Sequence, residues 1–149
     1  MKKAIVSFLF LSIVCTTACS LKKDSKVQHL TYQGFTEKIW DIEKHPDSFA
    51  FKGNTAVIVD FYAKWCGSCV QLLPIMEKMA NEYEGDLTIY KVDVEKEKDL
   101  ATVFKIQGLP ALLCFSSTGS HVRRYNGLPS EEELRTIIEE ELLDTPAQP

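Results

Sequence analysis

Beyond residue 19, the sequence lacks a second pair of closely spaced cysteines or histidines. The pair that it has is Cys66 and Cys69, and a C-x-x-C spacing also occurs as half of a structural zinc site. Such a site needs four ligands, so two more would have to come from isolated residues. The remaining candidates, none in a paired spacing, are Cys114, His29, His45 and His121. The sequence therefore gives little support to a zinc site.

An excess of positive charge and internal repeats are also missing. The whole chain has a formal net charge of −4, from 17 Lys and Arg against 21 Asp and Glu. Removing residues 1–18 takes away two lysines and no acid, which leaves 15 basic and 21 acidic residues and a net charge of −6. An acidic chain argues against a nucleic-acid partner. With 149 residues, 45% of them hydrophobic, the sequence predicts one globular domain.

The N-terminal apolar run is too short to span a bilayer comfortably, because a span takes about 20 apolar residues. Two lysines precede the apolar stretch Ala4–Val14 and small residues follow it, which is typical of a secretory signal. Thr17-Ala18-Cys19 resembles the end of a bacterial lipoprotein signal, in which the cysteine is acylated, although Thr16 stands where that pattern usually has leucine. A plain cleaved signal and an uncleaved membrane anchor are the alternatives.

We therefore expect residues 1–18 to be a lipoprotein signal peptide and Cys19 to be the lipidated residue. Residues 19–26 would form a polar tether. The protein would be exported and lipid-anchored in a bacterial cell envelope, on the periplasmic side of a membrane.

The pattern of apolar residues along the sequence predicts the strands and helices of the domain. The stretch Ala56–Tyr62 is almost continuously apolar, which suits a strand covered on both faces in a parallel sheet. The order β-α-β-α-β-α-β-β-α predicts an α/β fold over residues 27–143, a central mixed sheet with helices on both faces, followed by a loose tail at 144–149. The expected strands are 27–30, 56–62, 87–94, 111–115 and 122–125, and the expected helices are 31–40, 67–83, 98–104 and one beginning at Ser130.

Capping and apolar spacing refine these helices. Thr31 is expected to cap the first helix, and Ser130 with Glu133 is expected to form a capping box on the last. In the helix 98–104, the residues expected to face inward are Leu100, Val103 and Phe104.

The two paired cysteines stand at the start of the expected helix 67–83. Because they are three positions apart, they share one helix face and can form a disulfide. Cys66 falls at the helix N-terminus, where free N–H groups and the helix dipole favour a thiolate, so a redox-active pair is predicted. A static disulfide in an oxidising compartment is the alternative. Cys114 alternates with apolar neighbours and is expected to be a buried core thiol.

Three residues near the pair could take part in its chemistry. Asp60 lies in the apolar strand, where a carboxylate should have a raised pKa; it would accept the proton of the inner thiol, or else make a structural hydrogen bond at the strand end. Lys91 would approach Asp60 from the neighbouring strand, or be a solvated edge lysine. Trp65 would shield the sulfur and offer a flat docking surface, or be a half-exposed packing residue.

These motifs together resemble the thioredoxin family, over roughly residues 27–143. The segments that follow the order and spacing of the family are Val59 to Cys69, Pro74, Lys91 to Val94, Gly108-Leu109-Pro110 and Thr118 to Gly127.

The resemblance implies roles for individual residues. Cys66 would be the exposed nucleophile and Cys69 the buried resolving thiol. Pro110, after Leu109, would be a cis-proline that faces the disulfide and helps to bind the substrate backbone. Gly127 would belong to the neighbouring docking loop, where the lack of a side chain permits close approach.

Two features depart from the family pattern. Between the cysteines stand Gly67 and Ser68, where the family usually has Gly-Pro. Ser68 keeps a backbone N–H that proline lacks, so the thiolate would be solvated differently and the redox potential would change. The segment 41–54 is longer than in a minimal thioredoxin, and the sequence assigns it no role.

The resemblance implies a thiol–disulfide oxidoreductase that reduces disulfide-containing envelope proteins through a Cys66/Cys69 dithiol. Electrons would come from a membrane dithiol donor, no metal or nucleotide cofactor is expected, and the protein would be a monomer. The alternatives are an envelope disulfide oxidase or isomerase, and a non-catalytic thioredoxin-fold binding module. Only 41 positions separate Cys69 from Pro110 (110 − 69), which leaves little room for the inserted helical domain of the dedicated disulfide-introducing family.

Overall fold

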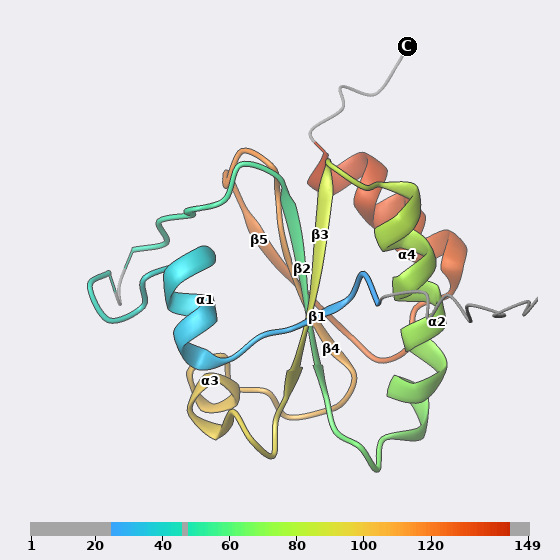
Figure 1. The fold of residues 1–149 in the computed structure, drawn as a ribbon, viewed down its shortest axis with the longest axis horizontal. Helices are drawn as coiled ribbons and strands as arrows, with labels where there is room; N and C mark the ends of the chain where they lie inside the picture. Colours follow the sequence, from blue (N-terminus) through green and yellow to red (C-terminus); the bar gives the residue numbers. More distant parts are fainter. Residues whose placement is uncertain (1–24, 46–47, 144–149) are drawn as a thin grey trace, which may run out of the picture.

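The computed structural model describes residues 25–45 and 48–143 (Figure 1). The expected signal peptide, the expected lipidation site Cys19 and the expected C-terminal tail lie outside these residues. The described part contains a five-stranded sheet in the order β1-β3-β2-β4-β5. Its strands are β1 (Gln28–His29), β2 (Ala56–Tyr62), β3 (Leu87–Asp93), β4 (Ala111–Phe115) and β5 (Val122–Asn126).

The sheet is mixed, as the sequence predicts. Strands β1 and β2 both pair with β3 in the parallel sense. Strand β4 runs antiparallel to β2, and β5 runs antiparallel to β4 and forms the edge. Gly119, with φ of 68°, supplies the left-handed residue in the turn between β4 and β5. A parallel core is therefore extended by an antiparallel hairpin.

Helices cover both faces of the sheet (Figure 1). Helices α1 and α3 lie on one face, and α2 and α4 lie on the other. Their bounds are α1 (Tyr32–Lys38), α2 (Gly67–Glu82), α3 (Lys98–Val103) and α4 (Glu131–Thr136), which continues as the π-helical turn η1 (Ile137–Leu142). The Thr31 side chain caps α1, and the capping box of Ser130 and Glu133 opens α4, so both cap predictions are confirmed.

Two hydrophobic layers result, because successive side chains of a strand point to opposite faces. On β2, Ala56 and Ile58 belong to the layer under α2 and α4, while the layer under α1 and α3 contains Val57, Val59 and Phe61. The strand is buried along nearly its whole length, which explains its continuous apolar sequence. Any polar residue on β2 must therefore lie inside the protein.

Two details of the α1/α3 face correct the sequence prediction. Val103, expected to face inward, is 42% exposed. Helix α3 ends there, and Phe104 fills the available space instead, with ring contacts to Phe35 at 5.2 Å and to Phe61 at 5.9 Å. Helix α1 also ends at Lys38, before the expected end near residue 40, and the chain turns out of the helix at that point.

The segment 41–54 closes the α1/α3 layer at one end. Trp40 forms an isolated antiparallel bridge with Phe51, and the Phe51 ring stacks on Phe115 with 6.0 Å between centroids. Phe49 contacts the same Phe115 ring at 5.6 Å. Phe115 is the last residue of β4, whereas Pro110 precedes its first residue, so this aromatic cluster lies at the opposite end of β4 from Pro110.

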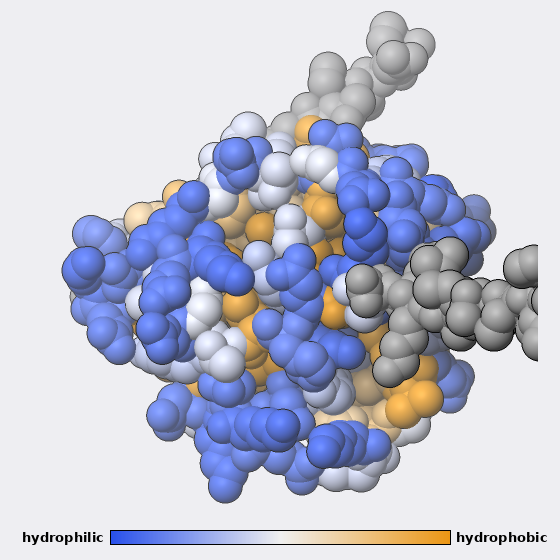
Figure 2. All heavy atoms as spheres, in the orientation of Figure 1, coloured by the Kyte–Doolittle hydropathy of each residue, from blue (hydrophilic) through white to orange (hydrophobic). Residues whose placement is uncertain are grey.

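Polar side chains cover most of the visible surface over the helices, and hydrophobic atoms show mainly between them (Figure 2). A further hydrophobic area lies over the N-terminal end of α2 (Figure 2). Within the described residues, none of the helices has both the length and the apolar character that crossing a membrane would require.

Candidate functional site

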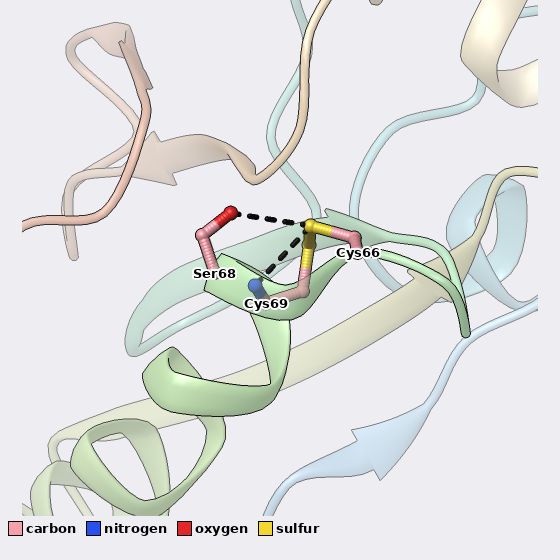
Figure 3. The surroundings of a disulfide bond; sticks show 3 residues. All are labelled: Cys66, Ser68 and Cys69. Atoms are coloured by element: carbon pink, nitrogen blue, oxygen red, sulfur yellow. Dashed lines mark hydrogen bonds between the residues drawn. A yellow bond between two sulfur atoms is a disulfide. The ribbon is translucent and has the colours of Figure 1, made fainter.

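The site forms where β2 leads into α2. After β2 ends at Tyr62, a short turn places Cys66 as the N-cap residue of α2 and Cys69 in its first turn. The two sulfurs are joined in a disulfide, with 5.3 Å between the Cα atoms (Figure 3). The backbone N–H of Cys69 donates a hydrogen bond to Cys66 Sγ at 3.2 Å. A thiolate on Cys66 would thus meet a donor and the positive end of the helix dipole.

Ser68 adds a contact that the sequence reasoning missed. Its Oγ lies 3.4 Å from Cys66 Sγ (Figure 3), whereas the sequence argument had considered only its backbone N–H. The position of Ser68 in the chain could have predicted this contact, because the side chain of a residue two positions after a helix N-cap can reach back to the side chain of the N-cap residue. Beside it, Gly67 is open, since a β-carbon placed there would have nothing within 4 Å.

The cysteines differ in helix position but hardly in burial. Cys66 is 5% exposed and Cys69 is 4% exposed, so the prediction of an exposed Cys66 is wrong for the disulfide form. Apolar residues from the end of β2 and from three loops pack with the two cysteines, namely Tyr62, Ala63, Val94 and Leu109. This cover comes from tertiary packing, which helix position does not reveal. The assignment of Cys66 as the attacking thiol remains a prediction that rests on its N-cap position.

The loop before β4 faces the cysteines. The Leu109–Pro110 peptide bond is cis, as the resemblance implies, and Leu109 packs against the cysteine cluster. The Gly127 N–H donates to the Pro110 carbonyl at 2.9 Å, which places the loop after β5 beside the cis-proline. Gly127 has φ of 90°, a conformation that favours glycine. The structure therefore brings Leu109, Pro110 and Gly127 together, with Leu109 packed against the cysteines.

Trp65 stands at the solvent side of the site and is 70% exposed, which is more than the half-exposed packing residue of the alternative would be. Its indole Nε1–H donates to Glu95 Oε1 at 3.3 Å. Glu95 was missed in the sequence, although it follows β3 as Trp65 follows β2, and parallel strands end at the same sheet edge. Trp65 also lines a hollow of about 260 Å³, whose other walls are Val94, Ala101, Ile106, Gln107, Gly108 and Leu109.

A second exposed apolar residue lies close to the cysteines along the chain. Val70, directly after Cys69 in the first turn of α2, is 64% exposed. With Trp65 directly before Cys66, it places large apolar side chains at both ends of the C-x-x-C segment. Trp65 and Val70 thus flank the two cysteines along the chain with exposed apolar side chains.

Asp60 is buried on β2, and its Oδ1 has no hydrogen-bond partner among the described residues. Loss of solvent raises the pKa of Asp60 to about 7, although the charge of Lys91 acts in the opposite direction. Lys91 is the residue paired with Asp60 in the register of β2 and β3, so the expected approach from the neighbouring strand is confirmed. A carboxyl group with a pKa near 7 can both accept and release a proton at neutral pH.

Cys114 is a buried free thiol on β4, where it pairs with Ile58 of β2. Burial, with a further contribution from Glu141, raises the pKa of this thiol well above its ordinary value. A thiol of this kind is unreactive at neutral pH, which confirms the prediction of a core residue. Cys66 and Cys69 are therefore the reactive sulfurs of the described part of the chain.

Comparison with known proteins gives a consistent result. The thioredoxin family model matches residues 26–140. The chain is 36% identical over 111 residues to a thioredoxin of Borreliella burgdorferi, an alignment that covers 74% of this chain and 93% of that protein. It is 38% identical over 88 residues to thioredoxin C-2 of Corynebacterium nephridii, covering 59% of this chain and 81% of the relative.

Among solved structures, the fold is similar to that of chloroplastic thioredoxin z, with a TM-score of 0.62 and 26% sequence identity. The superposition covers 76% of this chain and 92% of the other. These alignments cover 81–93% of the known proteins and 59–76% of this chain.

Proposed function

This chain belongs to the thioredoxin family, and from that premise we propose that it reduces disulfides of proteins in a bacterial cell envelope while anchored by lipid on Cys19. It is a thiol–disulfide oxidoreductase, and the family acts on disulfide-containing proteins. The observation that carries the proposal is the Cys66–Cys69 disulfide at the N-terminus of α2, where the Cys69 N–H points at Cys66 Sγ.

The reaction transfers two electrons from the dithiol to the client. The Cys66 thiolate attacks one sulfur of the client disulfide, which forms a mixed disulfide and releases the other client sulfur as a thiolate. Cys69 loses its proton and attacks Cys66 Sγ, which releases the second client thiolate and closes the Cys66–Cys69 disulfide. The client has then gained two electrons and takes up two protons, while the pair is oxidised.

Asp60 is proposed to take the proton of Cys69 in the second step. Its pKa of about 7 makes the carboxylate and the carboxylic acid comparably populated near neutral pH. The side chain belongs to β2, which leads directly into the loop that carries the cysteines. Lys91, opposite Asp60 in the sheet, favours the ionised form and so tunes this acceptor.

The surface around the disulfide supports client docking. The client backbone would approach the loop of Pro110 and Gly127, which the Gly127 N–H bond to the Pro110 carbonyl holds together. An apolar client side chain would fit the hollow beside Trp65 and Leu109. Docking there would bring a client disulfide beside the apolar residues that pack against the cysteines.

The direction of electron flow distinguishes a reductase from an oxidase or isomerase. Between the first turn of α2 and Pro110, the chain forms only the rest of α2, β3 and α3, with no inserted helical domain. Equilibration of the purified protein with defined ratios of reduced and oxidised dithiothreitol would give the potential. We expect a value below about −220 mV, in the range of thioredoxin and reducing glutaredoxins. A value above about −180 mV would favour the oxidase or isomerase instead.

The envelope location depends on Cys19. Mass spectrometry of the mature protein should find an N-terminal Cys19 that carries acyl chains, and Cys19→Ser should leave the precursor uncleaved by a lipoprotein signal peptidase. An unmodified Cys19, or cleavage elsewhere, would contradict the anchor.

A membrane dithiol carrier would return electrons to the Cys66/Cys69 pair. The protein would act as a monomer, which light scattering of the detergent-solubilised chain can test.

A further inference from the structure

The first described residues are bound to the middle of α2 and to the turn that follows it. The Lys26 backbone N–H donates to Glu77 Oε2 at 2.9 Å, and the Ser25 hydroxyl donates to the other oxygen of the same carboxylate. The Lys26 ammonium forms an ion pair with Glu84 at 2.5 Å. We call Ser25, Lys26, Glu77 and Glu84 the N-terminal latch. The next residue, Val27, is buried in the hydrophobic layer under α2 and α4.

The electrostatics of Glu77 agree with a formed latch. Partial loss of solvent raises the pKa of Glu77, but hydrogen bonds from Ser25 and from the backbone N–H groups of Lys26 and Val27 outweigh it, so the net pKa lies below the ordinary value. The carboxylate is therefore ionised at neutral pH and accepts all three donors. The latch fixes the point at which the chain enters the domain, beside α2 (Figure 1).

The distance from this entry point to the disulfide follows from helix geometry. Cys66 and Glu77 are 11 positions apart on α2 (77 − 66), or about 17 Å along the helix axis. Only seven positions separate Cys19 from Lys26 (26 − 19), and a fully extended chain of that length spans at most about 25 Å. With the width of the latch itself, the disulfide stays within about 50 Å of Cys19.

We propose that the short tether and the latch restrict this enzyme, among membrane-anchored clients, to disulfides that lie within about 50 Å of the bilayer surface. The inference rests on the proposed lipid anchor at Cys19. For an anchored client, access to the enzyme is then set by the height of its disulfide above the membrane, as well as by fit to the docking surface. Within this layer the anchor raises the effective concentration of the enzyme, and above it that concentration falls to nearly zero because the tether cannot span the gap.

The test uses the full lipidated chain in phosphatidylcholine vesicles. Two reporters carry the same small disulfide-containing domain on transmembrane anchors, one on a rigid helical spacer of about 20 residues and the other on one of about 80, which place it about 30 Å and about 120 Å from the bilayer. Reduction is followed in vesicles and, as the control, in detergent micelles with the same components. A matched variant carries 40 Gly/Ser residues inserted between Lys22 and Lys23.

We expect the native chain in vesicles to reduce the short reporter at least 10-fold faster than the tall one, and the lengthened tether to reduce that ratio to below 3-fold. Equal rates for the native chain in vesicles would overturn the height restriction, and so would a ratio that the longer tether leaves unchanged. Loss of activity in detergent, or failure of the chain to remain on vesicles, would instead contradict the proposed function, so the two failures are distinguishable.

The latch has its own test, by hydrogen exchange of the full chain in detergent. Glu77→Ala should speed amide exchange at Lys26 and Val27 by about 10-fold or more, because it removes the acceptor of both N–H groups. The control Glu132→Ala removes a carboxylate on α4 that has no hydrogen bond or ion pair among the described residues, and it should leave those amides unchanged. Unchanged exchange in Glu77→Ala would overturn the latch as the entry point.

Discussion

Asp60→Asn is the substitution whose effects on stability and on catalysis are most clearly opposed. Burial raises the folded-state pKa of Asp60 from 3.8 to about 7, so the folded protein binds this proton more tightly than the unfolded chain does. The stabilisation that comes from the tighter binding of this proton in the folded state is complete below pH 4. It is lost as the pH rises through about 7. The native protein is therefore destabilised at pH 8 by a buried charge that asparagine cannot carry.

The magnitude follows from the pKa. A rise from 3.8 to about 7 corresponds to about 4 kcal/mol, at about 1.4 kcal/mol for each tenfold change in proton affinity. The stability of Asp60→Asn relative to the native protein should improve by roughly this amount between pH 4 and pH 8. Any cost of burying the amide group is independent of pH and cancels in the comparison. Urea unfolding of the oxidised proteins across this range measures the difference.

Asp41→Asn provides a control of opposite sign. Hydrogen bonds and ion pairs with Lys44 and Lys52 outweigh some desolvation and lower the pKa of Asp41, so its stabilising contribution is present at neutral pH and lost in acid. Parallel stability curves for native protein and Asp60→Asn would refute the argument from burial.

Catalysis by Asp60→Asn should move the other way. Release of the mixed disulfide should slow by about 10-fold or more near pH 7, because Cys69 loses its proton acceptor, while formation of the mixed disulfide changes less. Stopped-flow measurement with a fluorescent disulfide separates the two steps. An unchanged release rate would give Asp60 a purely structural role.

Three further outcomes are expected. In the reduced protein, Cys66 should alkylate faster than Cys69 or Cys114 at pH 7, because its position at the helix N-terminus favours the thiolate, as mass spectrometry of a timed iodoacetamide reaction would show; faster labelling of Cys69 would reverse the assigned roles. Ser68→Pro should make the pair more reducing by about 30 mV, equivalent to about 1.4 kcal/mol, because the Cys66 thiolate loses the Ser68 hydroxyl that lies 3.4 Å from its sulfur; Ser68→Ala, which also removes the hydroxyl, should shift the potential in the same direction, and a shift of Ser68→Pro in the oxidising direction would show that backbone rigidity dominates. Gly119→Ala should destabilise the fold by about 1–3 kcal/mol in urea unfolding, since its φ is 68° and its β-carbon would lie 2.6 Å from a phenylalanine side chain; a neutral effect would mean that the hairpin relaxes.

The fold was predictable from sequence because its signals are local and repeated. The continuous apolar run of β2, the caps at Thr31 and Ser130, and the turn at Gly119 each act within a few residues. They give the order and type of the elements. The pairing of Asp60 with Lys91 also followed, because both lie at comparable depths in adjacent parallel strands.

The features that sequence reasoning missed depend on contacts between distant segments. Burial of Cys66 comes from Leu109, 43 positions away (109 − 66), and the outward orientation of Val103 follows from how Phe104 packs. Contacts of this kind do not appear in the hydrophobic periodicity of the sequence, because the burial of a side chain by distant residues depends on how separate helices, strands and loops pack together. The same holds for Glu77, whose partners at the N-terminus are more than 50 positions away.

The central claim is that Cys66 and Cys69 act as an attacking and a resolving thiol on protein disulfides. Trapping with Cys69→Ser tests it most directly, because removal of the resolving thiol should arrest the reaction at the mixed disulfide. The reduced variant is incubated with a protein that contains a disulfide, and the adduct is digested and analysed by mass spectrometry. The account predicts a stable, dithiothreitol-sensitive link between Cys66 and the client. No adduct, or an adduct at Cys114, would contradict it.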